Sequence, residues 1–301
     1  MITTDNTILD KILDQLFTPY RERVPDVQKI SNAMIAEGII NDEEEVVNDH
    51  IAFRTLGVPN LGIASFEKIF LHHGYTRRDY HNFPGKKLNA YWYSPPSEEY
   101  PRIFISELRV QELSTAAQEI IEDHTAHIHT DPVDLLNLDD PIAVGDFFHK
   151  PLWELPTLQE YNTLAEESEY AAWVIYNRYY LNHYTLRVHE FGEEYNTVEK
   201  FNQFLEGIGI KLNTAGGKVK VSEDGLLKQS STVAKMIEAE FRGVESQPIP
   251  GSYVEFAERL VLPEYRHLAA DQLERRHRRE GFESANADKI FESTYREQTG
   301  R

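Results

Sequence analysis

The stretch Asn48–Gly57 reads NDHIAFRTLG, a largely apolar run that contains one histidine and one arginine. Its branched and aromatic residues, with turn-forming residues on both sides, predict a β-strand from His50 to Leu56. Because side chains alternate along a strand, His50 and Arg54 share one face and the apolar residues dominate the other. The ordinary explanation for His50 and Arg54 is that they lie on a sheet face in contact with solvent. The alternative is a metal ligand at His50 with a carboxylate-binding group at Arg54, and the rest of the sequence decides between them.

Composition limits the class of partner and of site. The chain has 301 residues, and 41% of them are hydrophobic, which is enough for a proper core. Its 31 basic and 50 acidic residues give a net charge of −19, which disfavours nucleic acid and anionic membrane partners. With no cysteine, any metal must be held by His, Asp or Glu. The acidic, helically spaced N-terminus and the lack of a long apolar run lead us to expect a cytoplasmic protein.

The order of the predicted elements repeats along the chain. A helical lead-in (1–47) precedes a strand–helix–three-strand unit (48–108), a mostly helical insert (109–180), a second such unit (181–260) and a helical tail (261–301). Two similar βαβββ units indicate an internal duplication within one α+β domain, residues 1–301. If the units pack around a pseudo-twofold axis, their first strands face one shared cavity.

Matching positions in the two units carry histidine. Both first strands begin with a small polar residue followed by a histidine, His50 in the first unit and His183 in the second. Glu255 lies in the closing strand SYVEFAERL, where a lone carboxylate is unfavourable unless it is paired or bound to a metal, and Glu258 falls on the opposite face. Two imidazoles and one carboxylate form the facial triad of non-haem Fe(II) sites, and they also suit Mn(II) or Zn(II).

Other polar residues have simpler explanations. His124, His127 and His129 in HTAHIHT lie at the end of a predicted helix. Glu107 could be a fourth metal ligand, although a structural salt bridge explains it more readily. The arginine-rich stretch 275–279, with acidic neighbours, is typical of a solvated helix face rather than of a binding site.

The chain resembles one protein family through motifs in the same order: DHIAFRT, GYTRRDYHNFPGKKLNAYWYSPP, PRIFISEL, NHYTLRV, GSYVEFAER and ANADKIFEST. This family, catalogued as DUF1338, comprises 2-oxoadipate dioxygenases/decarboxylases, also called hydroxyglutarate synthases. It is similar in architecture to vicinal-oxygen-chelate enzymes, so the resemblance implies two such βαβββ modules around a shared metal cavity. The family's H-x-x-x-R motif falls on His50 and Arg54, and its other metal ligands fall on His183 and Glu255.

The resemblance implies an Fe(II) enzyme of lysine catabolism that takes a small anionic 2-oxo acid and O₂. It would convert 2-oxoadipate to 2-hydroxyglutarate and CO₂. His50 and Arg54 would contact the substrate, with Arg54 binding its far carboxylate, and the family's C-terminal contact falls on Ala285 and Asn286. Two other functions fit the same residues: an oxygen-independent metal-dependent isomerase, lyase or hydrolase, and a non-catalytic small-acid binding protein. Glu107 as a fourth ligand would favour the oxygen-independent enzyme.

Overall fold

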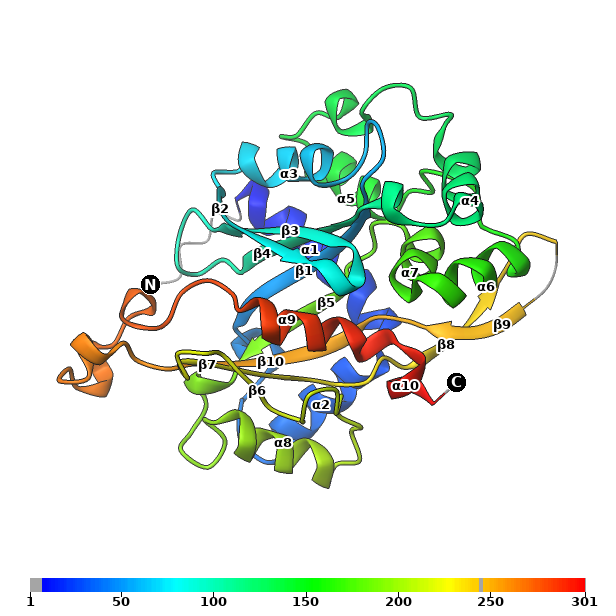
Figure 1. Ribbon diagram of the computed structural model, residues 1–301. Helices are drawn as coiled ribbons and strands as arrows, with labels where there is room; N and C mark the ends of the chain where they lie inside the picture. The colour runs from blue at the N-terminus through cyan, green and yellow to red at the C-terminus, as the bar shows by residue number, and fades with distance from the viewer. Residues whose placement is uncertain (1–6, 244–245, 301) are drawn as a thin grey trace.

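An eight-stranded mixed sheet forms the centre of the computed structural model, which describes residues 7–243 and 246–300. Its strands are β1 (Asn48–Leu56), β2 (Thr76–Phe83), β3 (Leu88–Ser94), β4 (Arg102–Leu108), β5 (His183–Arg187), β6 (Lys220–Val221), β7 (Leu227–Ser231) and β10 (Tyr253–Arg259). They lie in the order β2-β3-β4-β1-β5-β10-β7-β6 (Figure 1).

The strand pairing confirms the predicted duplication. β1 runs parallel to β4, and β5 runs parallel to β10 in the same way. β1 and β5 are antiparallel neighbours, so they form the seam between the two βαβββ modules. The arrangement β1-β4-β3-β2 on one side of the seam is matched by β5-β10-β7-β6 on the other. A pseudo-twofold axis therefore passes between β1 and β5, as the repeat predicts.

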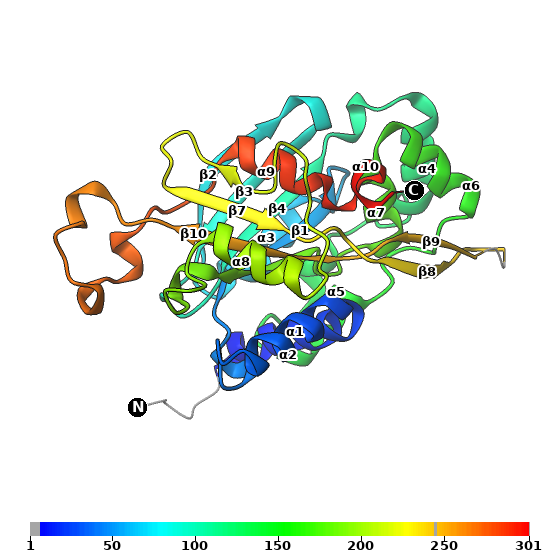
Figure 2. The same cartoon turned by 90° about the horizontal axis from the view of Figure 1, so that it is seen from below.

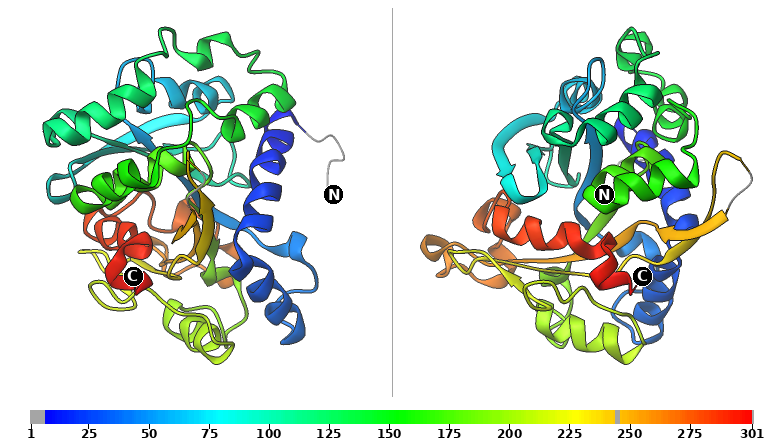
Figure 3. Two further views of the ribbon diagram at one scale, coloured as in Figure 1. Left: turned by 90° about the vertical axis from the view of Figure 1, so that its right-hand side faces the viewer. Right: turned by 45° about the vertical axis from the view of Figure 1, so that its right-hand side comes forward.

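Helices cover both faces of the sheet. They are α1 (Ile8–Arg23), α2 (Pro25–Ala36), α3 (Ile63–His72), α4 (Thr115–Thr125), α5 (Pro141–His149), α6 (Leu158–Glu167), α7 (Glu169–Asn177), α8 (Val198–Gly207), α9 (Ser284–Phe291) and α10 (Arg296–Thr299). The pair α1 and α2 lies on the side of the sheet opposite α9 (Figures 2 and 3). α9 contacts β2 at one sheet edge and β6 and β7 at the other. It therefore crosses the open side of the curled sheet.

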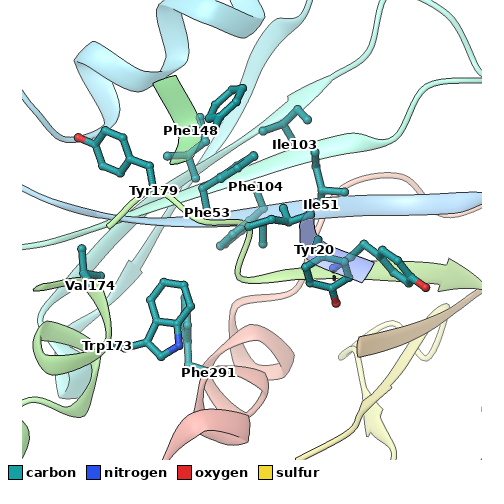
Figure 4. Packing of buried hydrophobic residues seen from close by; sticks show 14 of the residues in the cluster. Tyr20, Ile51, Phe53, Ile103, Phe104, Phe148, Trp173, Val174, Tyr179 and Phe291 are labelled. Carbon is teal, nitrogen blue, oxygen red and sulfur yellow. Dashed lines mark hydrogen bonds between the residues drawn. The ribbon is translucent and has the colours of Figure 1, made fainter. Parts of the chain in front are cut away.

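The core lies between the sheet and its helices. Phe53 of β1 stacks on Phe148 of α5, with ring centroids 5.7 Å apart (Figure 4). On the other side, the Tyr20 hydroxyl of α1 donates to the Tyr253 carbonyl of β10. A capping box between Thr7 and Asp10 starts α1. The Tyr20 hydroxyl also accepts from the Tyr184 amide of β5 at 3.3 Å. These contacts fix β1, β5 and β10, the strands that carry the candidate metal ligands.

Two segments differ from the sequence-based expectation. β8 (Met236–Glu240) and β9 (Ser246–Pro250) form a separate two-stranded ribbon. Between α8 and β6, Leu212 forms an isolated bridge with Thr232. The tail is helical only in α9 and α10. Residues 263–283 instead form short 3₁₀ turns and extended chain, because arginine side chains there bond to main-chain carbonyls elsewhere in the fold.

Candidate metal centre

His50, His183 and Glu255 converge at the seam between the modules. They lie on β1, β5 and β10, three neighbouring strands, and all three side chains are buried. Glu255 Oε2 is 3.4 Å from His50 Nε2 and 3.0 Å from His183 Nε2. One ligand atom from each residue lies within 4.8 Å of the others, so the group could hold a metal ion.

Hydrogen bonds orient each of the three ligands. His50 Nδ1 is 2.8 Å from Asp49 Oδ1, and His183 Nδ1 is 3.0 Å from Asn182 Oδ1. Because both partners are acceptors, they place the ring proton on Nδ1 and turn Nε2 toward the centre, where the lone pair of Nε2 can bind a metal. The Thr185 hydroxyl lies 3.0 Å from His50 Nε2. Gln229 Nε2 donates to Glu255 Oε1 at 2.6 Å, so Oε2 is the oxygen that faces the histidines. This donor set fits a metal ion that prefers nitrogen and oxygen ligands.

The charges at the centre favour a bound cation. Burial alone would raise the pKa of Glu255, but the charge of His50 and hydrogen bonds from both histidines lower it to about 2. Burial opposes protonation of His50, yet the Glu255 charge and the Asp49 hydrogen bond raise its pKa above the ordinary value. Burial lowers the pKa of His183. Glu255 is therefore ionised. Its negative charge stabilises either a proton on His50 or a metal ion bound in place of that proton.

The cavity beside the ligands is small and mostly apolar. It has a volume of ≈20 Å³, about that of one water site. Besides the three ligands, its lining consists of Phe104, Gln229, Tyr253, Phe282, Ala287, Ile290 and Phe291. The strand registers match Ala52 with Phe104 in the first module and Thr185 with Glu255 in the second. Phe104 therefore occupies the pseudo-twofold counterpart of Glu255, and the centre has three ligands rather than four.

Arg54 lies on the same strand as His50 but does not line this cavity. Its guanidinium is buried and donates to Thr294 Oγ1 and to the Phe291 carbonyl, both at 3.0 Å. Its Nε has no hydrogen-bond partner among the described residues. The Phe291 ring, which lines the cavity, has its centroid 5.6 Å from the guanidinium carbon. Figure 4 shows Phe291 beside Trp173, whose ring also packs on Arg54.

The two predicted contacts in the tail differ in position. Asn286 is buried, and its Nδ2 donates to Gln229 Oε1 at 3.0 Å. It therefore reaches Glu255 through Gln229 and does not line the cavity itself. Ala285 lies on the exposed face of α9, whereas Ala287 lines the cavity. A substrate contact at Ala285 or Asn286 stays a prediction.

Glu107 and His124 have structural contacts away from the centre. Glu107 accepts a hydrogen bond from the Ile63 amide at 2.9 Å, at the start of α3. It is neither a metal ligand nor a partner in any ion pair of the described residues, so both roles considered for it are wrong. His124 lies 3.4 Å from Glu160.

Two residues of the site were not identified from the sequence. Tyr253 stacks on His183, with ring centroids 4.7 Å apart, and its buried hydroxyl has no partner among the described residues. Alternation along β10 could have found it, because Tyr253 and Glu255 share a face. Gln229 carried no signal, since only the pairing of β7 with β10 brings it to Glu255.

Fold and site together define a protein of two βαβββ modules, with the vicinal-oxygen-chelate type of fold and a His-His-Glu group able to hold a metal. A glyoxalase-superfamily structure from Ralstonia eutropha has the same fold, with TM-score 0.70 at 22% identity over 92% of this chain and 87% of that one. The profile of the 2-oxoadipate dioxygenase/decarboxylase family matches residues 12–275, and the chain belongs to that family.

Two further comparisons agree with this assignment. A chloroplastic 2-oxoadipate dioxygenase/decarboxylase of Arabidopsis thaliana is 42% identical over 96% of this chain and 78% of that protein. The crystal structure of hydroxyglutarate synthase from Oryza sativa, in complex with 2-oxoadipate, has TM-score 0.87. It is 40% identical and covers 96% of this chain and 93% of that one.

The expected cytoplasmic location is wrong by the same comparison, because the Arabidopsis relative is named as chloroplastic. That expectation rested on the acidic, helically spaced N-terminus and on the lack of a long apolar run. The helical spacing reflects the burial of one side of α1 in the core and carries no information on the compartment. Within residues 7–243 and 246–300, no helix is long and apolar enough to cross a membrane.

Proposed function

We propose that this chain is a 2-oxoadipate dioxygenase/decarboxylase with Fe(II) held by His50, His183 and Glu255. One 2-oxoadipate and one O₂ would give one 2-hydroxyglutarate and one CO₂, a balanced reaction. The observation that carries the proposal is the convergence of three buried ligand atoms within 4.8 Å, in a chain of this family. When bound, the metal supplies Lewis acidity and oxygen activation.

Three protein ligands suit this chemistry better than four. A facial triad leaves coordination positions open for a chelating acid and for oxygen. Here the counterpart of Glu255 is an apolar ring, Phe104, and Glu107 caps a helix instead of completing a four-ligand centre. An oxygen-independent enzyme with a fourth ligand at Glu107 therefore loses its support.

Arg54 is the proposed anchor for the far carboxylate of the acid. Its planar guanidinium matches a carboxylate, and its Nε has no partner among the described residues. A six-carbon acid is far larger than the ≈20 Å³ cavity. We therefore expect Phe291 and Thr294 to release Arg54 and move outward as the acid enters. The acid's carboxylate would replace their two oxygens on the guanidinium.

Tyr253 offers one more group to the bound acid. Tyr253 lines the cavity and its ring stacks on His183, and burial raises the pKa of its hydroxyl, so the hydroxyl is a neutral donor. We expect it to donate a hydrogen bond to an oxygen of the acid. The rings of Phe104, Phe282 and Phe291 would exclude water around the reacting carbons.

The test is oxygen uptake by Fe(II)-loaded protein offered 2-oxo dicarboxylates of different length, with CO₂ and product mass followed together. We expect uptake and CO₂ release in equal amounts, highest with 2-oxoadipate. Glu255→Gln should lose metal and activity, whereas Glu258→Gln, on the opposite face of β10, should keep both. Glu258 caps α8 through the Val198 amide, and glutamine retains that acceptor. A fully loaded protein without oxygen uptake would refute the proposal.

A further inference from the structure

The histidine-arginine spacing of the first module occurs again in the second. His50 and Arg54 are four positions apart on β1, and His183 and Arg187 are four apart on β5. Because β1 and β5 are antiparallel, the two arginines lie at opposite ends of the seam. Both guanidinium groups are buried, and both have an Nε without a hydrogen-bond partner among the described residues. Arg187 is thus the pseudo-twofold counterpart of Arg54.

Arg187 lines a second and larger cavity, of ≈460 Å³, here called the Arg187 cavity. It lies between the end of the seam and the segment 263–280, which projects from the left of the sheet in Figure 1. Its basic lining residues are Arg102, Arg187, Arg259, Arg275, Arg278 and His189. Its acidic lining residues are Asp49, which is buried and paired with Arg102 and Arg259, and the solvent-exposed Glu190, Glu193 and Glu274. The prediction that the arginine-rich stretch 275–279 forms a solvated helix face is therefore wrong.

Two arginines of this cavity, Arg187 and Arg275, donate to main-chain carbonyls. Arg187 and Arg275 both donate to the Glu98 carbonyl, at 3.1 and 3.0 Å. Arg275 also donates to the Tyr100 carbonyl, and its distance to the Glu280 carboxylate is 3.9 Å. Carbonyl oxygens satisfy hydrogen bonds but carry no counter-charge. Arg187 and Arg275 therefore share one neutral acceptor, and the nearest carboxylate of Arg187 is that of the solvent-exposed Glu190, at 3.2 Å.

Burial and the neighbouring arginines lower the pKa values of two groups in this cavity. Burial and the nearby guanidinium groups of Arg102 and Arg187 lower the pKa of Arg275 to about 10. Burial and nearby arginines also lower the pKa of His189 to about 3, so this imidazole is neutral. His189 Nδ1 accepts from the Arg259 amide at 3.2 Å, which places the ring proton on Nε2. The cavity thus presents N–H donors of Arg187, Arg275 and His189. These donors lie in a chain with net charge −19.

We propose that the Arg187 cavity is a second binding site, for a small organic dianion that carries carboxylate or phosphate groups. Arg187 and Arg275 would supply the charge-assisted hydrogen bonds, and His189 Nε2 a neutral one. A volume of ≈460 Å³ accommodates a short dicarboxylate or a small phosphate ester. The site mirrors the proposed Arg54 carboxylate anchor across the pseudo-twofold axis.

The position of the cavity links it to the metal centre. Arg259 and Arg102, which line the cavity, both bind the Asp49 carboxylate that orients His50. An anion in the cavity competes with Asp49 for these two guanidinium groups. Its binding therefore changes the metal affinity of His50, and metal binding changes the anion affinity by the same factor. This link rests on the proposed metal role of His50, whereas anion binding does not.

The test is calorimetric titration of the full, metal-free chain with inorganic phosphate and, separately, with succinate. We expect saturable binding of at least one anion, weakened at least tenfold in Arg275→Gln and in Arg187→Gln. Arg276→Gln is the matched control, because Arg276 is exposed and lies outside the cavity lining. Tighter phosphate binding would identify a phosphorylated ligand, and tighter succinate binding an organic diacid.

Arg54→Gln separates this site from the proposed substrate site. Succinate binding that survives Arg54→Gln and weakens in Arg275→Gln supports the second site. No saturable binding to the wild type, or equal binding in Arg275→Gln and wild type, overturns it. If Arg187→Gln does not fold, the more peripheral Arg275→Gln still decides. Metal affinity that is unchanged by saturating anion refutes only the link to His50.

Discussion

Replacing Asp49 with asparagine tests the buried charges behind the metal centre. Asp49 is fully buried, and its carboxylate lies 2.7 and 2.8 Å from Arg259, 3.1 Å from Arg102 and 2.8 Å from His50 Nδ1. Asparagine keeps the shape but removes the charge. Because Glu280 still neutralises Arg102, chiefly Arg259 loses its counter-ion. We expect the free energy of unfolding to fall by about 3 kcal/mol, the lower end of the range for breaking a buried ion pair.

The same substitution should weaken metal binding, because the acceptor that orients His50 becomes neutral. Loss of such an outer partner typically reduces metal affinity about 10–100-fold. Asn182→Ala is the matched control, since Asn182 orients His183 in the same way but belongs to no ion pair of the described residues. It should weaken metal binding similarly while changing the free energy of unfolding by only about 1 kcal/mol.

Urea unfolding of the metal-free proteins and metal titration with a competing chelator measure both quantities. Burial opposes ionisation of Asp49, but Arg259 and Arg102 outweigh it and hold its pKa well below the usual range. A depressed carboxyl pKa stabilises the fold above the unfolded value of about 3.9. The difference between wild type and Asp49→Asn should therefore shrink as the pH falls below about 4. An Asp49→Asn protein as stable as wild type at pH 7, or less destabilised than Asn182→Ala, would refute this reasoning.

Four further predictions concern the metal centre and the proposed acid site. Metal affinity should fall as the pH is lowered through the raised pKa of His50, since a protonated imidazole cannot bind metal. Chelator competition that gives equal affinities at pH 8 and pH 5.5 would contradict this. Gln229→Ala should weaken metal binding about tenfold, because Glu255 Oε1 loses its donor, and an unchanged titration would count against that role. Tyr253→Phe should lower kcat/KM for 2-oxoadipate about tenfold, which corresponds to the loss of one hydrogen bond, and should leave metal affinity unchanged. Unaltered kinetics would show that the hydroxyl does not contact the acid. Arg54→Lys should raise KM more than tenfold at equal metal loading, and a KM like that of wild type would place the carboxylate elsewhere.

The grouping of the three candidate metal ligands was predictable because the two histidines repeat in phase with the modules. His50 and His183 occupy the same position in each first strand, and alternation along β10 separates Glu255 from Glu258. The fold was predictable for a similar reason, since each unit presents the same order of strands and helix.

What the sequence did not reveal depends on distant pairing. Gln229 reaches Glu255 only through the register of β7 against β10. In the tail, the local pattern around Arg275 suggests a helix, but its guanidinium bonds to the Glu98 and Tyr100 carbonyls, more than 170 positions earlier. The spacing of neighbouring residues contains no information on so distant a partner. A helix was therefore predicted around Arg275, where the chain and its side chains instead enclose a cavity.

The split of the ligands between two modules also bears on ancestry. One module alone supplies a single histidine, so an ancestral protein with one module would complete this seam only by pairing with a second copy about a twofold axis. Such a pair would be symmetric, with identical residues at the two positions now held by Phe104 and Glu255. Fusion of two such copies into one chain would allow these positions to diverge. On this view, the candidate metal centre has three ligands because Phe104 replaced a second carboxylate. A symmetric dimer could not make that change at one position alone.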